Sequence, residues 1–274
     1  MEHNIVVVSD LHVGSIFGLM PPGFVSVSGA PEGNEVNLNI GQKYLWECWT
    51  DLCSRLKKMK VAALVFNGDC IDGKQRKSEG AELCLNRCSD QAAAAAVVAR
   101  TIQKACGFPK TYVIKGTPYH SGTAGDEEDR FAKEINAGRA LRFLDLDIDG
   151  VVLNFLHGIG VGGGLYRATS MDREAMWSAL AGKEGRAVKA DCLIRSHAHY
   201  FLHLEFGSKH GVVNPCFQLQ TDYALKSSQY RMLPEIGNTI IRVDPEAKRN
   251  GEDPIHVEKF LYKLPVPKAT RLPL

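Results

Sequence analysis

The sequence has no long apolar run. None of its hydrophobic stretches approaches the roughly 18 residues that a membrane-spanning helix requires. Its first residues, Met1 to Asn4, also lack the basic segment that opens a signal peptide. We therefore expect a soluble protein that stays in the cytoplasm and does not enter a membrane.

The sequence also lacks an excess of either charge. Lys and Arg total 33 and Asp and Glu total 31, which leaves a formal net charge of +2. A strongly basic protein would be drawn as a whole to nucleic acid or acidic membranes. This balance excludes such a global attraction and leaves room only for a local patch.

Paired cysteine motifs are missing as well. The chain has eight cysteines, but none of them forms a Cys-x-x-Cys pair, and they are too sparse for a small disulfide scaffold. The helical spacing of Cys84 and Cys88 permits a zinc site but favours buried thiols, because short paired ligand spacing is absent. We expect reduced thiols, as in a cytoplasm.

The sequence does have the composition of a folded domain. Of its 274 residues, 45% are apolar and 23% are charged, which is enough to bury a sizeable core. We expect a single domain over residues 1–274. Two stretches, near residues 14–41 and 73–89, are rich in Gly, Pro, polar or charged residues and are expected to be loop insertions.

Short apolar runs alternate with helical stretches along the chain. The runs typical of buried strands are residues 5–8, 62–66, 111–114, 151–156 and 192–194. The helical stretches are residues 43–60, 91–106 and 127–140. Further strands are expected near residues 202–206, 211–215, 239–243 and 257–262. The pattern predicts a mixed α/β sandwich.

An acidic or imidazole side chain follows each of the first five expected strands. In chain order these residues are Asp10 and His12, Asp69, His120, His157, and His197 and His199. One such residue alone is more often structural, but the ordered set is informative because the ends of these strands share one edge in layered α/β proteins. Residues two apart in an extended segment point the same way, so each Asp-x-His or His-x-His pair can converge on one centre.

The mixture of ligand types indicates a transition-metal site. Imidazole together with carboxylate suits zinc, manganese or iron, whereas calcium and magnesium prefer oxygen ligands alone. The ligands are too numerous for one tetrahedral ion and fit two ions that share a bridging carboxylate. Such a pair can hold a hydroxide for in-line attack on a phosphate ester.

These motifs resemble those of the calcineurin-like metallophosphoesterases. The matching segments, between residues 5 and 199, are Asp10-Leu-His12, Gly68-Asp69, His157-Gly158 and His197-Ala-His199. The resemblance implies a four-layer αββα sandwich of two mixed sheets flanked by helices. It also implies a first ion held by Asp10, His12, Asp69 and His199, and a second held by Asp69, His157 and His197, with Asp69 as the bridge.

The sequence departs from this family at one motif. Where members usually have Gly-Asn-His followed by Asp or Glu, the chain has Gly116-Thr117-Pro118-Tyr119-His120, a form that resembles some bacteriophage and prophage members. Thr117 takes the place of an asparagine that would bind the second ion, and its hydroxyl is a poorer ligand. A turn through Pro118 could bring His120 back to the site, either as a metal ligand or as the group that protonates the leaving oxygen.

The resemblance predicts a metal-dependent phosphoesterase. We expect two divalent ions, with manganese favoured over iron, zinc or nickel, and a phosphodiester substrate such as a nucleotide or nucleic acid. The alternatives are a phosphomonoesterase or protein phosphatase, and a catalytically weak metal-binding scaffold of the same fold. Four basic residues could bind substrate phosphate, but an ordinary solvated surface explains them equally well: Lys74, Arg76, Lys77 and Arg167.

Overall fold

The N-terminal strand β1 (His3–Val8) lies at the centre of a five-stranded sheet. The computed structural model describes residues 2–26, 35–76, 78–121, 126–160, 166–207, 209–227 and 233–265. Strand β1 pairs in parallel with β2 (Val61–Asn67), which pairs in parallel with β3 (Lys110–Ile114). On its other side β1 pairs antiparallel with β9 (Ile236–Val243), and β9 pairs antiparallel with the edge strand β10 (Ile255–Tyr262).

A second mixed sheet has the strand order β4-β5-β6-β8-β7. Its central strands β5 (Val151–Phe155), β6 (Cys192–Arg195) and β8 (Lys209–Val213) run parallel to one another. The edge strands β4 (Leu144–Ile148) and β7 (Leu202–Phe206) are antiparallel to their neighbours. Every strand that the sequence predicts is present in one of the two sheets.

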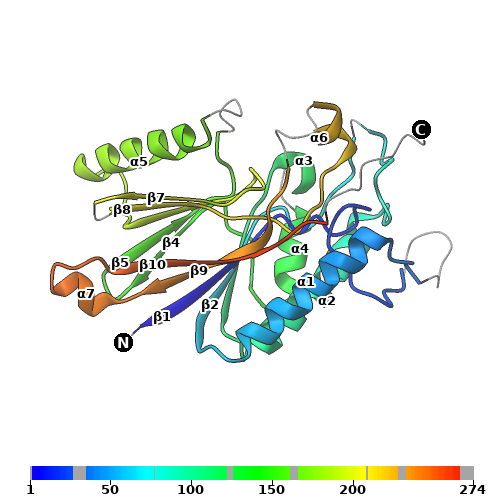
Figure 1. Cartoon of the computed structure of the whole chain (residues 1–274), viewed down its shortest axis with the longest axis horizontal. Coiled ribbons are helices and arrows are strands. Elements are labelled where there is room, and N and C mark those ends of the chain that lie inside the picture. The colour runs from blue at the N-terminus through cyan, green and yellow to red at the C-terminus, as the bar shows by residue number, and fades with distance from the viewer. Residues whose placement is uncertain are drawn as a thin grey trace, which may run out of the picture.

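The two sheets pack face to face, with helices on both outer faces (Figure 1). Ile5 and Val7 of β1 point into the apolar layer between the sheets, whereas Val6 and Val8 point toward the helices. This burial on both sides explains why β1 is a continuous apolar run. The outer face of the first sheet is covered by α1 (Ile40–Leu56), α2 (Cys88–Ala105) and α4 (Asp126–Glu134). The expected αββα arrangement is confirmed.

Helix α5 (Arg167–Lys183) provides the fourth layer. Its Met171 and Ala175 pack on Leu193 and Val213 of the second sheet, and the helix lies over β7 and β8 (Figure 1). The sequence prediction had no helix here and had no strand at β4. The remaining helices, which are short, are α3 (Pro118–Ser121), α6 (Asp222–Ser227) and α7 (Pro245–Arg249). Within the described ranges, no helix has both the length and the apolar content needed to cross a bilayer.

The predicted helices are present, but their ends differ. Helix α1 begins at Ile40 rather than residue 43 because Asn39 and Gln42 form a capping box, in which each side chain accepts a hydrogen bond from the backbone of the other. Helix α4 ends at Glu134, and the predicted extension to residue 140 is wrong. Asn136 has a φ of 59°, which is incompatible with continuing a right-handed helix.

Candidate metal centre

The polar residues singled out in the sequence lie just beyond the ends of β1, β2, β5 and β6. Backbone hydrogen bonds hold the four loops together in pairs. The N–H of Asp10 donates to the carbonyl of Gly68 over 2.9 Å, and the N–H of His12 donates to that of Asp69 over 3.0 Å. In the second sheet, the N–H of Ser196 donates to the carbonyl of His157 over 2.9 Å. Each sheet therefore presents its site residues as a connected unit.

The backbone of the site is left-handed rather than extended. Positive φ angles occur at Asp10 (51°), His12 (45°), Asp69 (48°), His197 (70°) and His199 (57°). The expectation that paired residues converge because they share one face of an extended segment is wrong in its reasoning, although the side chains do converge. Left-handed conformations of residues other than glycine are strained and cluster at functional sites.

All the ligands expected from the resemblance come together. Oxygen and nitrogen atoms of Asp10, Asp69, His157 and His197 lie within 4.8 Å of one another, as do those of Asp10, His12 and His199. His157 Nε2 is 3.0 Å from Asp69 Oδ2, and His199 Nε2 is 3.3 Å from Asp10 Oδ1. Asp10 belongs to both groups, whereas Asp69, the carboxylate that the resemblance assigns as the bridge, belongs to the first group and to a third group with His12 and His120.

Two of these atoms have the environment expected of metal ligands. Among the described residues, Asp10 Oδ1 and His12 Nε2 are buried without a hydrogen-bond partner, and they lie 3.9 Å apart. Leaving polar atoms buried and unpaired is costly, and a cation between them would remove that cost. The donor set of imidazole nitrogens and carboxylate oxygens fits a divalent transition-metal ion.

The charges of the site already compensate one another. Burial acts to raise the pKa of Asp10, but His157 and His199 outweigh it and lower this pKa to about 2. Burial acts to lower the pKa of His157, but Asp69 and Asp10 outweigh it and raise this pKa to about 10. In the absence of metal the histidine therefore carries positive charge next to the carboxylates, and a bound cation would take its place.

Asp72 is a member of the site that the sequence analysis missed. This carboxylate is buried, and its Oδ1 accepts a hydrogen bond of 2.9 Å from Nδ1 of His12. The bond fixes the His12 tautomer that leaves Nε2 available for a metal, an arrangement typical of histidine ligands. Its position three residues after Asp69, in the same loop, was the signal that could have identified it.

Thr117 forms hydrogen bonds with the carboxylate of Asp69. Its backbone N–H donates to Asp69 Oδ1 over 2.7 Å, and its hydroxyl lies 3.2 Å from both carboxylate oxygens. Gly116 is required next to it because a Cβ there would lie 2.0 Å from Asp69 Oδ1. The turn thus packs directly against the carboxylate that the resemblance assigns as the bridge.

His120 reaches the site through α3. Its Nδ1 donates to the backbone carbonyl of Asp72 over 2.6 Å, and its ring centroid lies 4.5 Å from that of His12. The Nδ1 bond leaves Nε2 to act on a bound molecule or ion. Because His120 also forms a potential ligand group with His12 and Asp69, the geometry is compatible with both roles considered for it.

Glu128 of α4 is a second residue that the sequence analysis missed. This fully buried carboxylate accepts hydrogen bonds from the backbone N–H groups of Gly116 and Cys70, and so joins the two loops that flank Asp69. Burial, followed by the charge of Asp69, raises the pKa of Glu128 to about 7. The sequence signal was weak, because Glu128 lies within a run of four acidic residues that looks like an ordinary helix start.

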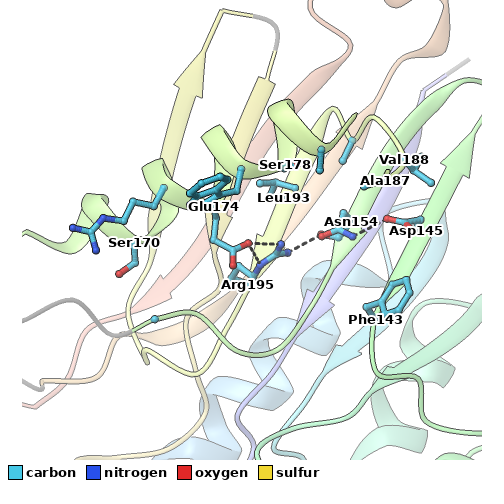
Figure 2. Close-up of a pocket in the computed structure, with 15 residues that line it drawn as sticks. Phe143, Asp145, Asn154, Ser170, Glu174, Ser178, Ala187, Val188, Leu193 and Arg195 are labelled. Carbon is cyan, nitrogen blue, oxygen red and sulfur yellow. Dashed lines mark hydrogen bonds and ion pairs between the residues drawn. The ribbon is translucent and has the colours of Figure 1, made fainter. Parts of the chain in front are cut away.

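A cavity of about 530 Å³ lies elsewhere, between α5 and the outer face of the second sheet. Figure 2 shows the side chains of Glu174, Arg195, Asn154 and Asp145 in a row along it. Arg195 donates to Glu174 over 2.7 Å and to the Asn154 carbonyl over 3.2 Å. None of the expected metal ligands lines this cavity.

The comparisons with known proteins gave matches only among solved structures. No protein-family profile matches the chain, and the curated proteins contain no significant match. Among solved structures, Vps29 from Chaetomium thermophilum is 17% identical, with 96% of this chain and 98% of that one covered and a TM-score of 0.42. Vps29 from Entamoeba histolytica complexed with Zn²⁺ is 12% identical over 94% and 98% of the two chains, with a TM-score of 0.42.

A structure described as a novel archaeal phosphodiesterase is also similar. It is 10% identical, with 94% of this chain and 99% of that one covered and a TM-score of 0.43. Likenesses of this size say nothing about the activity of the present chain.

Proposed function

We propose that this protein is a metal-dependent phosphoesterase of the calcineurin-like type. One observation carries the proposal: among the described residues, Asp10 Oδ1 and His12 Nε2 are buried without a hydrogen bond, at the centre of converging carboxylates and imidazoles from both sheets. A bound metal ion would satisfy both atoms, and in a phosphoesterase that ion would also serve catalysis.

The residues would hold two divalent ions, for which we propose manganese. We propose that Asp10, His12, Asp69 and His199 would hold one ion and that Asp69, His157 and His197 would hold the other, with Asp69 as the bridge. The proximity of these side chains in the potential ligand groups supports the assignment. Bound ions of this kind neutralise charge on a phosphoryl group and activate water for in-line displacement. Asp72 keeps the His12 ring oriented, and the Thr117 N–H orients the Asp69 carboxylate.

His120 is proposed as the group that acts on the leaving oxygen. The Asp72 carbonyl fixes its ring by accepting from Nδ1, which leaves Nε2 without that bond, and the side chain is 17% exposed, so a substrate can approach it. From that position it would donate a hydrogen bond or a proton. We propose a phosphodiester, such as a nucleotide or nucleic acid, as substrate, on the resemblance of the Gly116–His120 turn to phage members.

The test measures metal content and hydrolysis together. Purified protein is loaded with Mn²⁺, analysed for bound metal and assayed with bis-p-nitrophenyl phosphate and p-nitrophenyl phosphate. We expect the wild type to bind metal and cleave the diester faster than the monoester, and Asp69→Asn to lose both metal and turnover. Asp147→Asn on β4, away from the potential ligand groups, is the matched control and should keep both.

The other outcomes have distinct meanings. Metal without hydrolysis of either ester would favour the scaffold alternative. Faster cleavage of the monoester would favour a phosphomonoesterase. A chain that takes up no transition metal, even after reconstitution, would contradict the proposal as a whole.

A further inference from the structure

Gln75 is an inward-pointing residue in an otherwise exposed basic segment. Its side chain is 5% exposed, whereas its neighbours Lys74 and Arg76 face solvent. Its φ is 44°, a left-handed conformation that is unfavourable for a residue with a side chain. Strain of this kind persists only where the surrounding contacts impose it, which directs attention to what the amide group touches.

The two ends of the Gln75 amide make different contacts. Its Nε2 donates to Oδ2 of Asp72. Its Oε1 accepts from the Ser78 hydroxyl over 3.3 Å and from the Glu82 N–H over 3.1 Å. The nitrogen therefore holds the carboxylate beside the metal site, while the oxygen holds the loop that follows.

The other carboxylate oxygen of Asp72, Oδ1, points toward the metal site. Oδ1 accepts from His12 Nδ1 over 2.9 Å and from Gln218 Nε2 over 3.5 Å, and it lies 3.5 Å from His120 Nδ1. A neutral donor on Oδ2 fixes the carboxylate in place without cancelling its charge. A lysine or arginine at position 75 would form an ion pair with Asp72 and weaken its hold on His12.

The same segment also supports His120. A Cβ at Gly73 would lie 2.2 Å from the His120 carbonyl, so the two backbones are in direct contact. Gln91 fixes Gly73 by accepting from its N–H over 2.8 Å and donating to its carbonyl over 2.9 Å. The loop is therefore anchored on α2 at one point, and it contacts His12 through Asp72 and His120 through Gly73.

We propose that Gln75 is a positioning residue for the metal site, acting through Asp72 on His12. This inference rests on the proposed function only in that the site must bind a metal. It assigns the loop after Asp69 a role in ligand orientation, rather than the phosphate-binding role considered for its basic residues.

The test uses a substitution that separates the two ends of the amide. Gln75→Glu keeps an oxygen for Ser78 and Glu82 but replaces the donor to Asp72 with a carboxylate. We expect Mn²⁺ binding, measured by calorimetric titration, to weaken by about tenfold or more. Gln75→Met also removes the donor but adds no charge, and it should weaken Mn²⁺ binding as well. It keeps the test informative if Gln75→Glu fails to fold.

Two controls match these changes. Gln103→Glu replaces another buried amide, one that donates to Thr111 and to the Ile135 carbonyl, and should leave Mn²⁺ affinity unchanged. Ser78→Ala removes a loop contact of Gln75 without touching Asp72 and should also leave it unchanged. Equal weakening in a control and in Gln75→Glu would overturn the proposal.

The exchange variant Asp72→Asn with Gln75→Glu separates positioning from simple structural support. The amide introduced at position 72 can donate to the carboxylate introduced at position 75, so the melting temperature of the metal-free protein should recover relative to Gln75→Glu. Metal affinity should stay low because His12 then faces a neutral amide. Restored affinity, or wild-type affinity in Gln75→Glu, would contradict the inference. Failure of the wild type to hydrolyse esters would refute only the proposed function.

Discussion

The negative charge of Asp72 acts on the metal site through the ring of His12. Because Oδ1 accepts from His12 Nδ1, the carboxylate keeps Nε2 deprotonated and raises its basicity as a ligand. We predict that Asp72→Asn lowers Mn²⁺ affinity about 10- to 100-fold. Calorimetric titration of the purified variants measures this directly.

Asp253→Asn is the matched control for that prediction. Asp253 accepts from His210 Nε2 over 2.9 Å, so it also pairs with an imidazole, but neither residue belongs to the potential metal-binding groups. Its substitution should leave the affinity unchanged. An equal loss in both variants would mean that Asp72 acts on general stability rather than on the ligand.

His120 has two possible roles that one variant distinguishes. We predict that His120→Ala lowers turnover of the diester about 10²- to 10⁴-fold, as expected for loss of a proton donor, while the two-ion metal content stays that of the wild type. Turnover and elemental analysis are measured on the same preparation. Loss of one equivalent of metal would instead identify His120 as a ligand that compensates for the missing asparagine.

The sequence predicted which side chains converge better than it predicted their backbone conformation. The proposed ligands were found because an acidic or imidazole residue follows each strand in order, and strand ends meet at one edge. The left-handed backbone at Asp10, His12 and Asp69 could not be predicted, because it results from contacts between loops that lie far apart in the chain. Glu128 was missed for the same reason: its role depends on the N–H groups of Gly116 and Cys70.

At the scale of elements, helix α4 buries the carboxyl group of Glu128 in the core. The fold raises the pKa of Glu128 from its ordinary value of 4.5 to about 7, so it favours the protonated carboxyl. This contribution to stability is fully present below about pH 4.5 and is lost as the pH rises through about 7. We predict that in EDTA the wild type loses stability between about pH 4.5 and pH 7, and that Glu128→Gln loses less.

Chemical denaturation at several pH values checks this prediction. The informative quantity is the difference in stability loss between the wild type and Glu128→Gln. His157 has a raised pKa, so it lowers the stability of both proteins as the pH rises. The control is Glu134→Gln on the same helix. In the described structure the Glu134 carboxylate does not contact the loops around Asp69. Parallel curves for the wild type and Glu128→Gln would show that Glu128 does not titrate in this range.

Two elements were missed for different physical reasons. Strand β4 has the alternating pattern Leu-Asp-Leu-Asp-Ile, with its apolar residues packed between the sheets, and this signal was available in the sequence. Helix α5 gave little signal. Its buried residues are only Met171, Ala175 and Gly182, while Met176 and Trp177 are exposed, so its apolar residues do not mark one face.

At the scale of the molecule, the site joins the two sheets. Asp10, His12 and Asp69 come from loops of the first sheet, and His157, His197 and His199 come from loops of the second. A bound ion would therefore link halves of the protein that otherwise meet through the apolar layer between them. Binding that occurs only in the folded state stabilises it by mass action.

We accordingly predict that Mn²⁺ raises the melting temperature and that EDTA reverses the change. At a free-ion concentration of 100 times Kd, the gain is about 2.7 kcal/mol per site, or roughly 5 °C per site for a chain of this size. Thermal melts over a Mn²⁺ series measure the effect, and the melting temperature should rise with ion concentration. Asp69→Asn should lose the shift, whereas Asp147→Asn should keep it. A shift that persists in Asp69→Asn would place the bound ion outside the group of residues that the two sheets bring together.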